Sequence, residues 1–566
     1  MFVVNFFAQG KINLEIKSGG KLAEKTYKKI ALARPISVKD KNLPDTLSAR
    51  IYRELRELGY FFPKVKIDSL AYARDSSSVF VRIVIDERRQ SIVKSVSVQA
   101  DTPEDSSYVY EKLAWQIGLP FQPAIMRHIF SEILKKYENN GFPFARLKIK
   151  SVKWLPANDS VKDAALFIEF RNGRTSVIDS IVVKGNTKTK DYVIIRNARI
   201  KKGEVYSRKK IFDAVANLAR LGFFKKISFP KFYYNSQNKG VLEFYVEEKN
   251  TNVFDGIVGY VPKRNDAPGY LTGYVKMNLS NIFGTERAFG FEWKKIDRYS
   301  QYFDIKYKEP WLFGMPLNLN LSVMQRTQDT SYVQRKYGAV FEYLATSKLH
   351  ASLLYSFEET VPFENAAVVV KHSVFNTSGV NFFYDTRDDV LIPASGYLIN
   401  TTLKYSRKNV LSETSEEGDD NQYRIEADAA AYVRLYRTNI AALGLHYRNV
   451  EGKKLEISDL YRFGGTNSLR GFNEDIFSGN VIAWSNLEYR LLLSRDSYLF
   501  AFFDSGYFYN KVLKDNPGAV WENFTYGYGA GISFSTGVGI MKVSFALGEG
   551  DAFSQGKIHF GIAGGF

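Results

Sequence analysis

The residues best suited to a specific interaction are Arg470 and two carboxylates that follow it in the chain. Arg470 lies in residues 461–472, YRFGGTNSLRGF, between runs that alternate as β-strands do. Glycine in such a stretch allows a positive φ or a close backbone approach. If Arg470 is buried, its charge needs a carboxylate partner, and Glu488 and Asp504 are the candidates. The alternative is a surface turn in which water solvates the arginine.

Catalytic and metal chemistry have little support in the rest of the chain. The sequence contains no cysteine, which excludes disulfides, cysteine-ligated zinc and thiol catalysis. The histidines are scattered without the spacing of a metal-binding motif, and we interpret them as ordinary residues. We therefore predict no catalytic residue, no metal site and no cofactor, and we expect that the chain is not an enzyme. The histidines are His128, His350, His372, His446 and His559.

The composition is typical of a transmembrane β-barrel. Aromatic residues make up 15% of the chain, with 36 Tyr and 43 Phe, and there are 41 Gly, although only 45% of the residues are hydrophobic. In such a barrel alternate residues face lipid, and aromatic side chains gather at both membrane interfaces. No run of about 18 apolar residues supports a transmembrane helix.

Residues 251–566 carry the alternating pattern of β-strands. At about 10 residues per strand and a similar number per connection, this region supplies about 16 antiparallel strands. A soluble sandwich would show the same alternation, with one face toward a core. Gly527, Gly529 and Gly531 have the spacing of a dinucleotide-binding loop, but no helix follows them, so that interpretation fails.

Residues 11–250 contain a repeat of about 80 residues. In each copy a helix ends at a glycine that precedes an aromatic strand; these glycines are Gly59, Gly141 and Gly222, which are 82 and 81 residues apart. Each copy reads β-α-α-β-β, and in the third copy the last two strands are predicted over residues 223–234 and 241–248. We therefore predict three α+β repeats before the barrel. The predicted boundaries are residues 11–88, 89–173 and 174–250 for the repeats and 251–566 for the barrel.

Charge is distributed unevenly along the chain. Residues 1–250 hold 46 Lys and Arg against 26 Asp and Glu, whereas residues 251–566 hold 32 and 34. The excess charges are therefore +20 and −2. A basic front half attracts anionic lipid or an acidic partner, or it serves solubility alone. Residues 1–10 are apolar but have no basic region, and we interpret them as the end of an export signal that starts upstream; the alternative is a short ordered or frayed N-terminus.

In the order of its motifs the chain resembles the BamA/TamA-type outer-membrane insertase superfamily, which carries periplasmic POTRA domains before a barrel. The three repeats resemble POTRA domains. The most specific resemblance is an ordered set: Gly464-Gly465, then residues 469–472 (LRGF), residues 486–488 (NLE) and residues 502–506 (FFDSG). The resemblance as a whole covers nearly the whole chain. The number of repeats, three, is most similar to that of the TamA-like branch.

The resemblance implies roles for particular residues. In that family the loop folds into the barrel lumen and its arginine meets acidic residues of the inner wall, so Arg470 is expected to pair with Glu488 and Asp504. The barrel closes at a weak seam between its first and last strands, near residues 253–261 and 557–566, and a free edge there templates incoming strands. Gly564 departs from the family pattern, which places an aromatic residue there. The loop residues are Gly464, Gly465, Leu469, Arg470, Gly471 and Phe472, and the seam residues are Val253, Val258, Tyr260, Phe560, Gly561 and Phe566.

The resemblance also implies a function. We expect a factor for the assembly or translocation of outer-membrane proteins, located in the bacterial outer membrane with its N-terminal half in the periplasm. Its expected partners are unfolded outer-membrane proteins or secreted substrates, outer-membrane lipid, and a periplasmic or inner-membrane partner on the basic repeats, but no nucleic acid. The alternatives are a dedicated two-partner-type secretion pore and, third, a passive porin.

Overall fold

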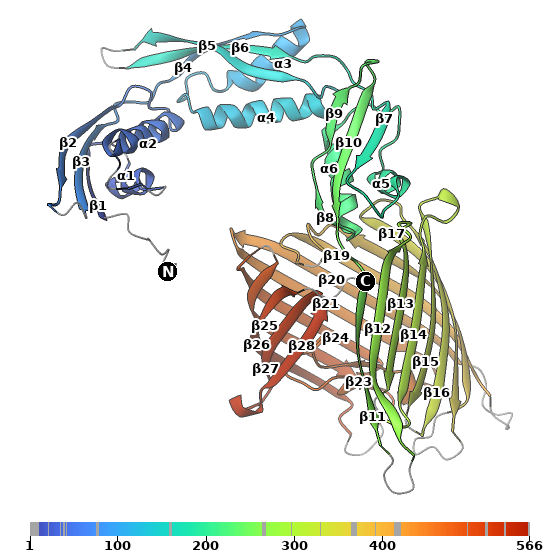
Figure 1. The fold of residues 1–566 in the computed structure, drawn as a ribbon. Coiled ribbons are helices and arrows are strands. Elements are labelled where there is room, and N and C mark those ends of the chain that lie inside the picture. Colours follow the sequence, from blue (N-terminus) through green and yellow to red (C-terminus); the bar gives the residue numbers. More distant parts are fainter. Residues whose placement is uncertain are drawn as a thin grey trace. The chain divides into compact units, whose positions relative to one another are not determined.

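The computed structural model describes residues 11–563 apart from residues 21, 34–35, 38–39, 41, 75–77, 158–160, 263–267, 296, 329, 364–370, 391, 412–419, 495, 515–518 and 537–538. Residues 1–10, which we interpreted as the end of an export signal, lie outside the described residues. The predicted fold class is confirmed, because three β-α-α-β-β repeats precede a large antiparallel sheet (Figure 1). The exact boundaries of the repeats stay a prediction.

The first repeat packs two helices on one face of a three-stranded sheet. The strand order is β1-β3-β2, with β1 parallel and β2 antiparallel to β3. Leu47, Ile51 and Leu55 recur on one side of α2 and are buried in the same core as Val81 and Ile83 of β3. The elements are β1 (Lys11–Ser18), α1 (Glu24–Ala31), α2 (Leu43–Glu57), β2 (Lys64–Tyr72) and β3 (Ser78–Asp86).

The second and third repeats follow the same plan. The second has the strand order β4-β6-β5, and in the third β10 lies between β7 and β8 and also pairs with β9. The sequence predicted one strand over residues 223–234; the structure has two, β8 and β9, with Pro230 in the break because proline offers no N–H to the ladder. The elements are β4 (Val93–Gln99), α3 (Pro103–Ala114), α4 (Pro123–Asn139), β5 (Arg146–Pro156) and β6 (Lys162–Arg171), then β7 (Ser180–Lys184), α5 (Asp191–Ala198), α6 (Arg208–Arg220), β8 (Phe224–Ile227), β9 (Lys231–Tyr234) and β10 (Gly240–Glu248).

The repeated glycines end the second helix of each repeat. Gly59, Gly141 and Gly222 have φ values of 93°, 98° and 71°, a backbone region that other residues rarely adopt. Each glycine lies just beyond its helix and turns the chain toward the next strand.

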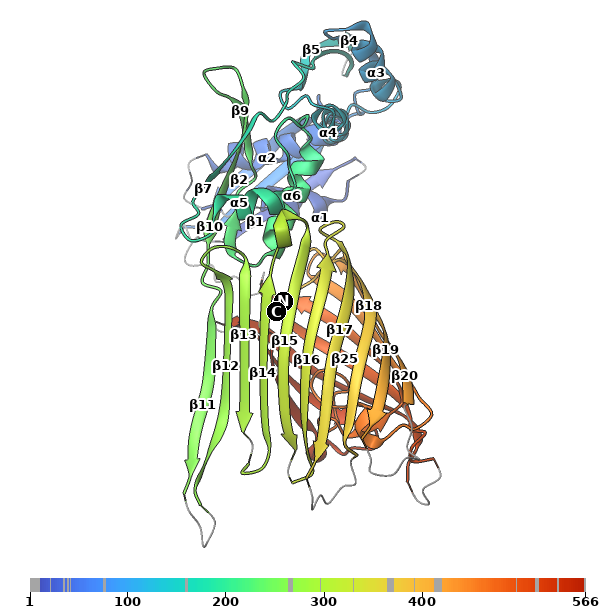
Figure 2. The same ribbon diagram turned by 90° about the vertical axis from the view of Figure 1, so that its right-hand side faces the viewer.

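Among the described residues from Val253 to Ala563, 16 strands form one sheet, in agreement with the predicted number. Each strand pairs with the next in the chain, except that β21 pairs with β24 because the β22–β23 hairpin leaves the sheet. The sheet curls around on itself into a barrel (Figure 2). Strands β11 and β28 stand at its two ends. The strands are β11 (Val253–Val261), β12 (Tyr270–Ile282), β13 (Arg287–Lys295), β14 (Gln301–Glu309), β15 (Leu317–Gln328), β16 (Tyr332–Tyr343), β17 (Leu349–Pro362), β18 (Ser373–Asp385), β19 (Gly396–Val410), β20 (Asp420–Tyr436), β21 (Asn439–Glu451), β24 (Val481–Leu492), β25 (Ser497–Tyr509), β26 (Glu522–Thr536), β27 (Gly539–Gly548) and β28 (Lys557–Ala563).

The chain divides into two compact units, and the third repeat is shared between them. One unit holds residues 1–182, 200–213 and 230–243, and the other holds residues 183–199, 214–229 and 244–566. Helix α5 therefore belongs to the same unit as the barrel. Among the described residues, no helix is long and apolar enough to cross a membrane.

Helix α5 contacts the turn between β12 and β13. Arg196 Nη2 donates to Glu286 Oε2 at 2.9 Å, and Asn197 Nδ2 donates to the same oxygen at 2.6 Å. The Asn281 side chain donates to Thr189 Oγ1 at 2.8 Å. Glu286 is only 5% exposed, so its charge depends on these donors.

Two further arginines of the third repeat bind main-chain oxygens of other barrel turns. Arg199 Nη2 donates to the carbonyl oxygen of Leu344 at 2.9 Å, in the turn between β16 and β17. Arg220 Nη1 donates to the carbonyl oxygens of Ser347 and Asp385 at 2.8 and 3.0 Å. Both arginines thus attach the third repeat to turns within one compact unit.

A carboxylate organises the turn before α5. Glu248 accepts hydrogen bonds from the backbone N–H groups of Thr187, Lys188 and Thr189 at 2.9, 2.9 and 2.6 Å. Burial alone would raise the pKa of Glu248, but the hydrogen bonds from Thr189, Lys188 and Thr187 outweigh burial and lower its pKa to about 2.

Candidate functional site

The candidate site is the loop carried by a short hairpin, β22 (Tyr461–Phe463) and β23 (Phe477–Gly479). Gly464, Gly465 and Gly471 have φ values of 125°, 90° and 97°, so the turns of the loop need glycine at these positions. Ser468 supports the first turn, because its hydroxyl accepts the N–H of Gly464 at 2.7 Å.

The structure brings Arg470 together with both predicted carboxylates. Its Nε and Nη2 donate to the two oxygens of Asp504 at 2.7 and 2.8 Å, and its Nη1 donates to Glu488 Oε1 at 2.8 Å. The Arg470 backbone N–H also donates to Asp504, at 3.1 Å. Arg470, Glu488 and Asp504 are 6%, 7% and 0% exposed. The planar fork of arginine matches this geometry, whereas the alternative of a solvated surface turn is wrong.

A second arginine balances the charge. Arg490 Nη2 lies 2.7 Å from Glu488 Oε2, so two arginines face two carboxylates. The Arg470 guanidinium also lies 3.6 Å from the centre of the Phe502 ring, close enough for a cation–π interaction. Alternation along β24 places Arg490 on the same face as Glu488, whereas Phe502 was not among the predicted partners of Arg470. Alternation could have identified Phe502 as a partner, since Phe502 shares a face of β25 with Asp504.

Apolar residues hold the sides of the loop. Leu469 is fully buried with Phe463, Ile482 and Phe508, and Phe472 packs against this cluster. Asn486 Nδ2 donates to the carbonyl oxygen of Ser468 at 2.7 Å.

Glycines on the neighbouring strands let the loop backbone approach the wall. A Cβ at Gly527 of β26 would overlap the carbonyl oxygen of Arg470. A Cβ at Gly548 of β27 would lie 3.0 Å from the carbonyl oxygen of Gly471. The sequence showed the alternation of glycines at 527, 529 and 531, but not that Gly527 faces the loop. That relation depends on residues more than 50 positions apart in the chain.

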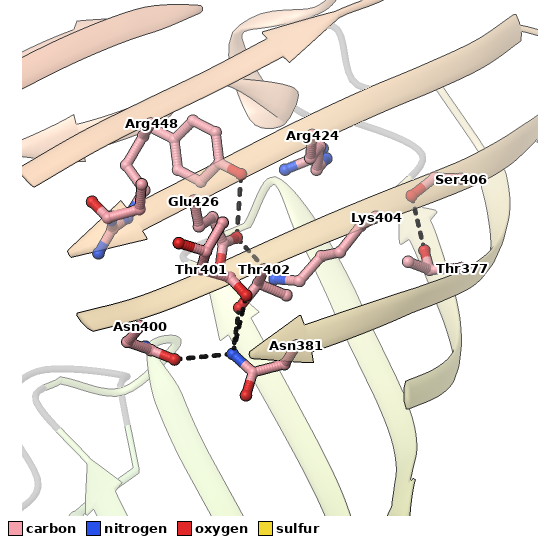
Figure 3. A network of polar contacts seen from close by, with 12 residues as sticks. Thr377, Asn381, Asn400, Thr401, Thr402, Lys404, Ser406, Arg424, Glu426 and Arg448 are labelled. Atoms are coloured by element: carbon pink, nitrogen blue, oxygen red, sulfur yellow. Dashed lines mark hydrogen bonds and ion pairs between the residues drawn. The ribbon is translucent and has the colours of Figure 1, made fainter. Parts of the chain in front are cut away.

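A separate polar network binds the base of the loop to the sheet (Figure 3). Tyr461 donates its hydroxyl hydrogen to Glu426 Oε1 at 2.9 Å, and Lys404 Nζ lies 2.6 Å from the same oxygen. Nearby, Asn381 Nδ2 donates to Asn400 Oδ1 at 2.7 Å. The inward-facing partners in this network come from β18, β19 and β20, which precede the hairpin in the chain. The strands that hold the ionic partners of the loop, β24 and β25, follow the hairpin. The loop and its hairpin therefore contact wall strands on both sides of their place in the chain.

The predicted seam residues lie on the two end strands. On β11, alternation places Val253 on the opposite face from Val258 and Tyr260, which are 56% and 65% exposed. On β28, Phe560 is 53% exposed, whereas Gly561 faces the loop, because a Cβ there would lie 3.3 Å from Thr466 Cγ2. Phe566 lies outside the described residues.

The structure also shows a contact that the sequence did not predict, from the loop to the last strand. Gly471 N–H donates to His559 Nε2 at 2.9 Å, and His559 Nδ1 lies 3.3 Å from Thr466 Oγ1. The scattered spacing of the histidines predicts only an ordinary role for His559. Among the described residues, no group of three or more His, Asp or Glu is arranged to hold a metal ion.

Two family models match the chain. A model described as the Omp85 superfamily domain matches residues 281–566. A model described as a surface antigen variable number repeat, of the POTRA type, matches residues 176–249.

The chain is similar to two curated proteins and to one solved structure. The outer membrane protein assembly factor BamA of Nitratidesulfovibrio vulgaris Hildenborough is 24% identical over 421 residues, 67% of this chain and 49% of that protein. BamA of Neorickettsia risticii Illinois is 22% identical over 420 residues, 69% of this chain and 55% of that protein. The chain thus spans about half the length of these curated relatives. The crystal structure of Haemophilus ducreyi BamA lacking POTRA domains 1–3 has a TM-score of 0.51 and 16% identity, and the match covers 83% of this chain and 98% of that one, which is a likeness of fold.

Proposed function

Because this chain belongs to the Omp85 superfamily, we propose that it assembles β-barrel proteins in a bacterial outer membrane. The curated relatives are named outer membrane protein assembly factors. In this proposal the three repeats lie in the periplasm and capture unfolded clients, while the 16-stranded sheet spans the membrane. The work is done by pairing backbone groups, and no catalytic step is required.

The observation that carries the proposal is the strand order of the sheet, which leaves β11 and β28 at its ends within the described residues. An end strand offers backbone N–H and C=O groups to an incoming extended segment. Outward side chains on both strands are apolar and exposed: Phe254 is 67%, Val258 56% and Ile558 75% exposed. In lipid, a client strand that pairs with such an edge satisfies backbone groups that water cannot reach.

The loop has a supporting role in this proposal. Arg470, Glu488 and Asp504 form a buried ionic cluster on the inner wall beside the last strands. We propose that this cluster fixes the loop in the lumen and thereby holds the wall next to the seam in one shape.

The basic repeats are proposed to contact anionic groups in the periplasm. The excess of +20 charges in residues 1–250 supports an acidic protein partner or an anionic lipid surface. Vesicles with and without anionic lipid, incubated with the full chain in nanodiscs, distinguish these sources, because a protein partner would leave the two vesicle types equally unbound.

A reversible tether across the seam tests the proposal directly. The chain has no cysteine, so any disulfide that forms within one molecule joins the two engineered cysteines. Cysteines at Phe254, Val258 or Tyr260 are combined one at a time with a cysteine at Phe560, and the purified protein is reconstituted in liposomes. The expected result is that oxidation stops the insertion of an unfolded barrel client and that reduction restores it.

The matched control is a tether inside the sheet. Leu321 and Ala339 are register partners on β15 and β16, so a disulfide between cysteines there leaves the seam unchanged. Insertion that continues with a closed seam tether, or that fails equally with the control tether, would contradict the proposal.

Depletion of the protein, followed by quantitative proteomics of the outer membrane, separates the alternatives. A fall in many barrel proteins agrees with a general assembly factor, and a fall in a few agrees with a specialist. Loss of one secreted protein alone would favour the dedicated secretion pore. Ion conductance without any assembly defect would favour a passive porin.

A further inference from the structure

We infer that His559 holds the last strand of the barrel against the lumen loop, so that one loop position fixes both the inner wall and the edge of the sheet. His559 is one of the middle residues of β28 and is 7% exposed. Its ring contacts the loop through both nitrogens, to Gly471 and Thr466. We refer to the contacts among Thr466, Gly471 and His559 as the latch.

The chemistry of the latch defines the state of the ring. The donor at Gly471 is a backbone N–H, so His559 Nε2 must carry a lone pair. The neutral ring then carries its proton on Nδ1 and donates toward Thr466 Oγ1 at 3.3 Å. A side chain at this position therefore has to accept one hydrogen bond from the loop, and apolar residues lack that ability.

The latch completes a row of contacts across five neighbouring strands. Arg470 binds Glu488 of β24 and Asp504 of β25, and its carbonyl oxygen faces Gly527 of β26. The next residue, Gly471, lies against β27, since a Cβ on it would be 2.7 Å from the backbone of residues 547 and 548. The same residue then donates to His559 of β28. Two consecutive loop residues thus contact every strand from β24 to β28.

This row matters most for β28, which has the fewest other constraints. It pairs on one side only within the described sheet, through seven register positions with β27. Gly561 adds no side-chain packing of its own, although it lets Thr466 approach. A strand held by one short ladder frays readily, so a buried hydrogen bond at its middle has a large effect on its opening.

The experiment is hydrogen exchange of the full chain in nanodiscs, read by mass spectrometry in peptides covering residues 464–472 and 557–563. In His559→Ala we expect both segments to exchange up to about tenfold faster, the effect of one lost buried hydrogen bond. His559→Gln should stay near wild type, because its side-chain oxygen can accept the N–H of Gly471. Thr466→Val keeps the ring and should give an intermediate increase, which preserves the test if His559→Ala fails to fold.

His350→Ala is the matched control. His350 is a part-buried histidine of the barrel, on β17, and its Nδ1 lies 2.9 Å from Glu342. It should leave exchange in both segments unchanged. Unchanged exchange of residues 557–563 in His559→Ala, an equal rise in His350→Ala, or a failure of glutamine to rescue would overturn the inference.

The functional consequence rests on the proposed function, whereas the latch itself does not. If β28 opens the seam, His559→Ala should change the rate of client insertion in the liposome assay, and His559→Gln should restore it. Faster exchange of β28 without any change in insertion would support the latch and count against the proposed seam mechanism. The two ideas can therefore fail separately.

Discussion

Arg470 lies where water cannot replace a missing partner. Its two carboxylates are 7% and 0% exposed, and Arg490 shares one of them. Removing one member of such a cluster leaves a buried charge without compensation, which costs far more than the net contribution of the intact pair. The cluster therefore specifies where the loop lies rather than supplying much stability by itself.

Replacing Arg470 with alanine should destabilise the folded barrel by about 3–5 kcal/mol. Asp504 would lose its counter-charge, and Glu488 would lose one of its two arginine partners. Lysine should rescue little, since it cannot reach both carboxylates with a planar fork. The readouts are heat-modifiability on gels and complementation of a depleted strain. If both readouts matched wild type, the role of the cluster would be refuted.

Arg448 supplies the control for this prediction. It also pairs with a carboxylate, Asp428, at 2.7 Å, but Asp428 keeps a second partner in His446 at 2.7 Å. Arg448→Ala should therefore have a clearly smaller effect on both readouts than Arg470→Ala.

Glu248 predicts an acid-sensitive turn in the third repeat. Its folded pKa of about 2 lies below the ordinary value of 4.5, so its stabilising effect is complete above pH 4.5 and is lost as the pH falls toward 2. Pepsin cleavage of the full chain within residues 184–199 should increase over that range. In Glu248→Gln cleavage should already be high at pH 4.5, whereas Glu247→Gln, on the same strand, should behave as wild type.

At the scale of elements, the shape of β26 decides whether the loop fits. Gly527 leaves open the space that the Arg470 carbonyl oxygen occupies, while the ionic partners lie on β24 and β25. The open space at Gly527 and the ionic cluster are thus two separate requirements, and they lie on different strands.

Gly527→Ala should displace the loop although every charged residue is retained. We expect faster hydrogen exchange in residues 464–472 and a loss of complementation similar to that of Arg470→Ala. Gly290→Ala on β13 is the control, because its Cβ would meet Asn278 Oδ1 at an ordinary 3.5 Å and β13 is not a seam strand. If residues 464–472 of Gly527→Ala exchanged at the wild-type rate, position 527 would tolerate a side chain and the prediction would be wrong.

The sequence predicted those features that depend on local pattern. Alternation and repeat spacing predicted the barrel and the three β-α-α-β-β repeats, because each strand and helix carries its own periodicity. Charge pairing made Glu488 and Asp504 the candidate partners of Arg470, and the family resemblance favoured that pairing over a solvated turn. The contacts of Gly527 and His559 were not predictable, since they join the loop to strands that lie 57 and 88 residues further along the chain. The single strand predicted over residues 223–234 was wrong, because Pro230 interrupts the ladder between β8 and β9.

At the scale of the whole molecule, part of the third repeat shares one compact unit with the barrel, and α5 lies in that part. Arg196 and Asn197 both donate to Glu286, which is 5% exposed. The charge of Glu286 therefore ties helix α5 to the turn between β12 and β13.

Arg196→Ala should loosen this attachment by about 1–3 kcal/mol, because a buried carboxylate loses a charged donor. Exchange should rise in α5 and in residues 281–286, while strands β14 to β20 stay unchanged. The exchanged pair, Arg196→Glu with Glu286→Arg, should recover part of the loss. As a control, Arg208→Ala removes an ion pair with Glu138 in the other unit and should leave α5 as it is. If exchange of α5 rose in Arg208→Ala as well, the response of α5 would not be specific to the contact between Arg196 and Glu286.

The other two anchors, Arg199 and Arg220, have a consequence for how the protein can vary in evolution. They bind carbonyl oxygens of Leu344, Ser347 and Asp385, which every amino acid supplies equally. The amino acids of the turn between β16 and β17 can therefore be substituted without loss of these contacts. A single inserted or deleted residue would move the carbonyl groups out of reach. Among homologues, the lengths of these turns should be preserved more strictly than their composition.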